Sequence, residues 1–108
     1  MVAKGDVVSA GSVPTVELIH EGEHRRVLAV TGSVDRRGVE DLRDACRPEQ
    51  VPVGATVVVD FTGMTGCPSA LLLALVRIRD RLGSTRTLQL VGLTEALESI
   101  ALGGTPAR

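Results

Sequence analysis

Hydrophobic residues along this chain fall into short continuous runs, typical of buried strands, that alternate with segments of helical spacing. Two segments rich in Val, Leu and Ile, near 13–20 and 25–31, flank the polar stretch HEGEH and predict two antiparallel strands joined by a turn. The run ATVVVDF, 55–61, is too short for a helix and too apolar for an exposed strand. It predicts a central strand covered on both faces, with its end marked by Asp60 and the following Thr-Gly pair. The run TLQLVG, 87–92, predicts a second buried strand.

Helices are predicted between and after these strands. The carboxylate of Asp35 suits an N-cap, and apolar residues then recur on one face of a helix of about 36–47 that Pro48 ends. A second helix, 68–82, carries apolar residues at three- and four-residue steps. It has a proline in its first turn, and Gly83 suits the left-handed position just past its end.

The last predicted element is a short helix, 94–102, with Thr94 as its cap and an acidic residue in its first turn. The element order is thus β-β-α-β-α-β-α, which predicts an α/β fold: a mixed four-stranded sheet with about three helices packed against it. A chain of 108 residues is too short for two ordinary cores. We therefore expect a flexible lead-in at 1–12, one domain at 13–102 and a tail at 103–108.

Composition and charge exclude several classes of protein. With 12 Lys+Arg against 13 Asp+Glu, the net charge of -1 gives no field that attracts nucleic acid or an anionic membrane. One Phe and no Trp or Tyr argue against a protein that stacks bases. The two cysteines do not form a disulfide or zinc pattern, and no apolar run reaches the roughly 18 to 20 residues of a membrane span. We expect a cytoplasmic protein without a membrane span.

The stretch GCPSALLLAL, 66–75, offers three kinds of chemistry at the start of a helix. Cys67 before a proline is reminiscent of thioredoxin-like thiols, whose pKa the helix dipole lowers. The second cysteine of that motif is replaced by Ala70, however, and no basic residue lies nearby. Ser69 is either a phosphate acceptor stabilised by the helix N-terminus or a residue that merely caps the first turn or occupies it without a function.

Two further groups are candidate ligand sites: the histidines beside the predicted hairpin turn, and Arg36 and Arg37 of GSVDRRG, 32–38, which could bind phosphate. His20 and His24 flank the predicted hairpin turn, where solvent exposure is more common than metal binding. The chain contains neither a phosphate-binding P-loop nor a glycine-rich nucleotide fingerprint. We therefore predict no metal, no cofactor and no catalytic residue.

Several motifs together resemble the STAS domain family, named for sulfate transporters and anti-sigma factor antagonists. VTGSVD, 30–35, looks like the family's Gly-x-x-Asp at a strand end, and VVVDFTGMTG, 57–66, is similar to its central strand and following loop. PSALLLAL, 68–75, lies where the family commonly has Asp-Ser-x-Gly-Leu, and TLQLVGLTEALESIALGG, 87–104, closes the pattern. The resemblance covers about 13–102.

The resemblance implies a role for Ser69, which matches the serine that a partner anti-sigma kinase phosphorylates in bacterial anti-sigma factor antagonists. The unphosphorylated domain would bind the anti-sigma factor and free a sigma factor. Two residues depart from the family motif: Pro68 replaces the usual Asp and Leu71 the usual Gly. Leu72, Leu73 and Val76 lie off the main apolar face of this helix. If they are exposed, they form an apolar patch beside Ser69 of the kind that marks a protein contact, and the alternative is a helix buried on two sides. The expected partner-binding residues are Gly32, Asp35, Asp60, Ser69, Leu72 and Leu73.

The resulting hypothesis is a bacterial anti-sigma factor antagonist that acts by partner switching in transcription and stress regulation and is controlled by phosphorylation at Ser69. It is not an enzyme, and its partner is an anti-sigma factor with serine-kinase activity. An alternative is a degenerate STAS scaffold that binds constitutively because Pro68 and Leu71 have removed kinase recognition. A third interpretation is a Cys67 thiol redox enzyme. The sequence leaves open whether the chain is a monomer or a dimer.

Overall fold

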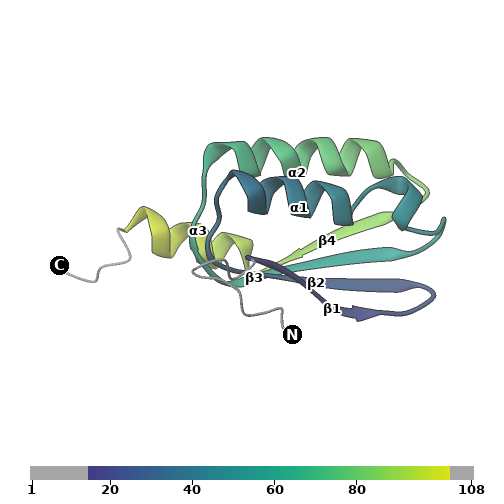
Figure 1. Ribbon diagram of the computed structural model, residues 1–108, viewed down its shortest axis with the longest axis horizontal. Helices are drawn as coiled ribbons and strands as arrows, with labels where there is room; N and C mark the ends of the chain where they lie inside the picture. Colours follow the sequence, from purple (N-terminus) through teal and green to yellow (C-terminus); the bar gives the residue numbers. More distant parts are fainter. Residues whose placement is uncertain (1–14, 103–108) are drawn as a thin grey trace, which may run out of the picture.

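The computed structural model describes residues 15–102, which form one four-stranded sheet with two helices, α1 and α2, on one face and a third, α3, at one end (Figure 1). The predicted order β-β-α-β-α-β-α and the α/β fold are confirmed. The predicted lead-in, the first two residues of the first strand and the C-terminal tail lie outside the described residues. The elements are β1 Val16–Glu21, β2 Arg25–Ser33, α1 Arg36–Ala45, a short 3-10 helix Pro48–Gln50, β3 Thr56–Gly66, α2 Ser69–Leu82, β4 Thr87–Val91 and α3 Leu93–Ala101.

The strands lie in the sheet in the same order as in the sequence. β1 and β2 form an antiparallel hairpin, whereas β2, β3 and β4 run parallel and are connected through α1 and α2. Parallel strands place their carboxyl ends at one edge of the sheet. The loops that lead from β2 into α1 and from β3 into α2 are therefore neighbours, and Ser33 pairs with Gly66 where these strands end.

The hydrophobic core lies between the sheet and the two helices that cover it. Val57, Val59 and Phe61 alternate toward this side and are fully buried. Val58 faces the other side, which α1 and α2 do not cover (Figure 1), yet it too is buried. The predicted burial of this β-branched run on both faces is confirmed at Val57, Val58 and Val59, although α1 and α2 lie on one side only (Figure 1). The prediction of a second buried strand is wrong: β4 is an edge strand with mostly exposed side chains.

β3 continues to Gly66, five residues beyond its predicted end. Its pairing with β2 shifts after Asp60, where β3 contains one more residue than the strand beside it. The Asp60 carboxylate accepts hydrogen bonds from the Thr62 amide, at 2.9 Å, and from the Thr62 hydroxyl, at 2.8 Å. Asp60 therefore stabilises an irregularity within the strand instead of marking its end.

The helix ends agree with the predictions to within two residues. Asp35 caps α1 as predicted, because its Oδ1 accepts a hydrogen bond from the amide of Gly38 at 2.9 Å. α1 ends two residues early, since Pro48 opens the 3-10 helix, and α2 begins one residue late, with Pro68 as its N-cap. Thr94 does not cap α3: the cap is Gly92, which has a φ of +74° that glycine adopts without strain.

Candidate functional site

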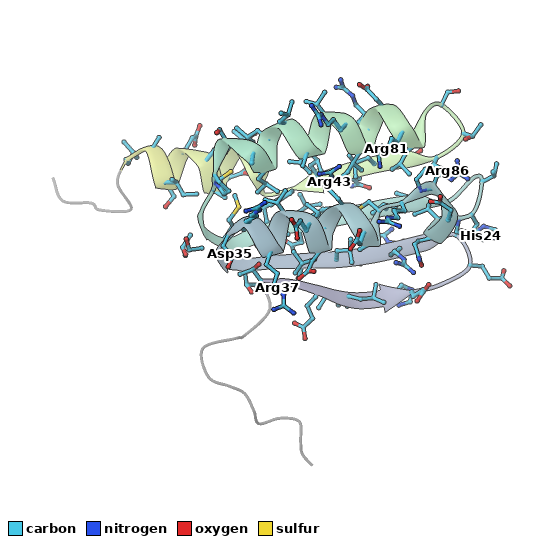
Figure 2. All side chains as sticks on the ribbon, turned by 45° about the horizontal axis from the view of Figure 1, so that its top comes forward. His24, Asp35, Arg37, Arg43, Arg81 and Arg86 are labelled. Atoms are coloured by element: carbon cyan, nitrogen blue, oxygen red, sulfur yellow. The ribbon has the colours of Figure 1, made fainter. Side chains whose placement is uncertain are left out.

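The starts of α1 and α2 lie side by side at the carboxyl edge of the parallel strands. The amide of Val34, in the first loop, donates a hydrogen bond of 3.0 Å to the carbonyl of Gly66, which ends β3. Figure 2 shows Asp35 at the start of α1, at the end of the molecule where α2 also begins. The two loops are thus held together by backbone hydrogen bonding, and they present the residues that follow them on one surface.

Ser69 is the first residue of α2 and is exposed. The N-cap position belongs to Pro68, whose side chain offers no hydrogen-bond acceptor, while its carbonyl accepts the amide of Leu71 at 2.9 Å. The interpretation of Ser69 as a cap is therefore wrong. First-turn amides have no acceptor within their own helix, and here no side chain caps them. The Ser69 hydroxyl stands at the positive end of a 14-residue helix.

Exposed aliphatic side chains continue from Ser69 along the same face of α2. Leu72, Leu73 and Val76 follow it at three, four and seven residues, a spacing that places all four on one side of a helix. Their exposed fractions are 40%, 53% and 44%. These residues are therefore exposed, and the alternative of a helix buried on two sides is wrong. We call Ser69, Leu72, Leu73 and Val76 the α2 stripe.

One side of the α2 stripe borders a groove of about 300 Å³ between α2, β4 and the start of α3. Its lining is apolar except for one arginine: Leu72, Leu75, Val76, Arg79, Leu88, Leu90 and Leu93. The hydrophobic run 87–92 predicts a buried strand, so it gives no sign that Leu90 lines an exposed groove, and Leu93 falls outside the helix predicted at 94–102.

Leu71, one of the two departures from the family motif, is fully buried. Its side chain packs into the core beneath α2 and does not reach the surface that carries Ser69. A leucine at this position therefore does not obstruct the exposed surface of α2. At this position the helix has gained core packing, and the exposed α2 stripe is left open.

The remaining predicted partner residues do not all lie together. Gly32, with a φ of +75°, pairs with Met64 near the end of β2, close to the loop that carries Asp35. Asp60 alternates with the buried Val59 and Phe61, so its side chain points to the sheet face opposite α1 and α2. Hydrogen bonds from the backbone and side chain of Thr62 lower the pKa of Asp60. Gly32 and Asp35 thus lie near the loop from which α2 begins, whereas Leu72 and Val76 face the groove toward β4 and α3 and Asp60 faces the opposite side of the sheet.

The thiol and histidine candidates show no reactive geometry. Cys67 is half-buried, its Sγ lies 3.6 Å from the carbonyl oxygen of Pro68, and burial raises its pKa above the ordinary value. Thiol catalysis requires the opposite shift, so the Cys67 redox interpretation has no support here. His20 and His24 are exposed, and residues 15–102 contain no cluster of three metal-ligating side chains.

These features define a small α/β domain whose most distinctive surface is an uncapped helix start followed by exposed aliphatic side chains. The family model described as "Mlab, STAS domain" matches residues 18–102, and the chain belongs to the STAS domain family. STAS domains are protein–protein interaction domains. A comparison with curated proteins gave no match. No helix within 15–102 is long and apolar enough to cross a membrane.

Proposed function

We propose that this STAS domain is a cytoplasmic anti-sigma factor antagonist without catalytic activity of its own. It binds an anti-sigma factor with serine-kinase activity through the α2 stripe and the neighbouring Gly32 and Asp35. Phosphorylation of Ser69 ends that binding, and the partner then returns to its sigma factor. The observation that carries the proposal is an exposed hydroxyl at an uncapped helix start, directly followed by exposed Leu72 and Leu73.

The electrostatics of the helix start favour a modification that leaves the fold intact. A phosphate on Ser69 would lie beside the free amides and the positive dipole end of α2, where negative charge is stabilised. It adds about -1.5 to -2 charges at pH 7. Pro68 offers no side-chain acceptor at the N-cap, so no capping side chain competes with the phosphate for the amides at the start of α2.

The same charge opposes binding of a partner to the α2 stripe. Burying an unpaired charge against aliphatic side chains costs several kcal/mol. At about 1.4 kcal/mol per tenfold in affinity, the partner would bind roughly two orders of magnitude or more weaker. Phosphorylation would thus act at the interface and not through unfolding.

A constitutive binding module is the second candidate, and the replacement of the family's Asp by Pro68 favours it. An acidic side chain before the serine would supply an acceptor that organises the loop or contacts a kinase, and proline supplies none. In this case the α2 stripe still binds a partner, but Ser69 is never modified.

The two candidates differ in their response to a charge at Ser69. Tagged wild type, Ser69→Asp and Ser69→Ala would be used to capture partners from a lysate of the native cell, with mass spectrometry of the eluates and of Ser69 in the endogenous protein. Ser84→Asp is the matched control, because Ser84 is also exposed but lies just beyond the far end of α2. Circular dichroism would verify that each variant folds.

The switch predicts that wild type, Ser69→Ala and Ser84→Asp capture an ATPase of the anti-sigma kinase class, that Ser69→Asp does not, and that endogenous Ser69 carries phosphate. Capture of that ATPase by all four proteins, with Ser69 unmodified, would support the constitutive module. Failure of all four to retain such an ATPase would refute the anti-sigma assignment.

A further inference from the structure

The edge strand β4 lacks the features that protect exposed strand edges from pairing. Its sequence, TLQLV, contains no charge and no proline, and its pairing with β3 is regular along its length. The opposite edge strand, β1, carries Glu17, His20 and Glu21 and has a register shift. Charges and irregularities of this kind discourage edge-to-edge association. The two edges of the same sheet therefore differ in their capacity to accept another strand.

The backbone of β4 offers hydrogen-bonding groups on its free side. The amide of Thr87 donates to the carbonyl of Ala55 at 3.1 Å, so Thr87 and every second residue after it face β3. Leu88 and Leu90 consequently direct their N–H and C=O groups away from the sheet. Within the described part of the chain, no strand lies on that side of β4.

The side chains of the same two leucines extend the apolar surface at this edge. Leu88 pairs with Val57 and Leu90 with Val59, which places both leucines on the sheet face that α2 covers. Leu90 is 38% exposed, and it lines the groove together with Leu72 and Val76. Free backbone groups and exposed aliphatic side chains thus occur along the same edge.

We propose that β4 pairs with β4 of a second copy of this chain, in antiparallel orientation and centred on Gln89. This register is self-complementary: Leu88 of each copy lies opposite Leu90 of the other, and these are the residues whose N–H and C=O groups face outward. The two sheets become one continuous sheet, and the leucines of both copies meet beneath the two α2 helices. The proposal goes beyond the function proposed above and does not depend on it.

The distribution of charge at the two ends of β4 favours a second copy as the occupant. Arg79 lies on the rim of the groove, toward the start of β4, and its Nε is 3.8 Å from the carboxylate of Asp80. Arg86, which donates a hydrogen bond to the carbonyl of Val51, and Arg81 lie at the same end, far from the end that carries Asp35 (Figure 2), so three arginines there outnumber one aspartate. The helix that follows β4, α3, carries Glu95 and Glu98 and no basic residue. Antiparallel pairing brings the basic end of each copy to the acidic end of the other, whereas parallel pairing would join like charges.

The first test measures the oligomeric state by sedimentation equilibrium. At about 100 μM, a concentration at which even micromolar self-association is nearly complete, the wild type should sediment as a dimer. Leu90→Lys should sediment as a monomer, because it places a charge in the pairing edge. Leu18→Lys is the matched control, since Leu18 is 46% exposed and lies in the other edge strand. It should remain a dimer, and circular dichroism should show both variants folded.

The second test probes the register by disulfide formation. Residues directly opposite in an antiparallel pair have Cβ atoms about 4.5–5.5 Å apart, which is close to disulfide geometry. Gln89→Cys, in a Cys67→Ala background, should therefore form an intermolecular disulfide under mild oxidation. Thr87→Cys in the same background should not, because Thr87 lies opposite Val91 in this register. The remaining cysteine, Cys46, is buried.

A monomeric wild type at this concentration would refute the proposal, as would a Leu90→Lys protein that still forms the dimer. Equal cross-linking of Gln89→Cys and Thr87→Cys would refute the register. If Leu90→Lys fails to fold, the cross-linking experiment decides alone. These readouts involve neither Ser69 nor the partner, so failure of the dimer leaves the proposed function untouched, and the reverse also holds.

Discussion

Replacement of Leu71 by alanine tests whether this departure from the family motif serves packing. The Leu71 side chain is 0% exposed and belongs to the core between α2 and the sheet. Truncation of a buried leucine to alanine costs about 2–5 kcal/mol, through lost transfer energy and the cavity left behind. For a domain of this size, about 2 kcal/mol corresponds to a fall in the unfolding midpoint of roughly 8 °C or more.

The measurement is urea unfolding followed by circular dichroism, at low protein concentration so that self-association does not contribute. Leu73→Ala is the control, because Leu73 is two residues away on the same helix but 53% exposed, and it should cost less than about 1 kcal/mol. Leu71→Gly, which restores the family's residue, should cost about 1 kcal/mol more than Leu71→Ala, because glycine is the poorer helix former. If Leu71→Ala costs no more than Leu73→Ala, then Leu71 is not a core residue and the packing explanation fails.

Two other features give predictions of their own. Gly92→Ala should destabilise the domain more than Gly54→Ala: both have positive φ, but only at Gly92 would the new Cβ meet a side chain, 2.5 Å from Cγ2 of Thr62. Equal free energies of unfolding for the two variants would contradict this contact. Burial raises the pKa of Cys46 from 9.0 to about 12, with Arg26 opposing the shift. The stability that the buried, neutral thiol contributes is complete below pH 9.0 and is lost as pH rises toward 12, because the thiol ionises at lower pH in the unfolded chain than in the folded one. The free energy of unfolding, measured under reducing conditions, should therefore fall less steeply above pH 9.0 in Cys46→Ala than in the wild type. Parallel curves of unfolding free energy against pH for the two proteins would refute the burial of Cys46.

The sequence predicts the element order well because each helix and strand has its own local signals. The Asp35 cap, the left-handed Gly83 and the β-branched run at 55–61 act within a few residues of where they stand in the chain. The extension of β3 to Gly66 could not be predicted in this way. It depends on pairing with Thr31 and Ser33, about thirty residues earlier, and on the hydrogen bonds that hold Asp60 to Thr62.

The candidate site was predictable where helical spacing alone determines exposure. Leu72 and Leu73 lie off the buried face of α2, and their exposure follows from that spacing. The direction of the Asp60 side chain follows only from the alternation of side chains along β3, counted from the buried Val59. This alternation places Asp60 on the face of the sheet opposite α1 and α2. The edge position of β4 depends on strand order, which the hydrophobic run 87–92 does not encode.

The two proposed interfaces are coupled because they share part of one helix. A partner on the α2 stripe would cover Leu72 and Val76 together with Ser69, and the same two side chains line the groove beside β4, where the proposed second copy would pair. One chain cannot bury these side chains in both contacts at once. By thermodynamic linkage, the factor by which the partner weakens self-association equals the factor by which self-association weakens partner binding. Under the proposed switch, phosphorylation of Ser69 would release the partner without adding charge at Gln89, so it would favour the proposed dimer, and the dimer would in turn hold the α2 stripe away from a new partner.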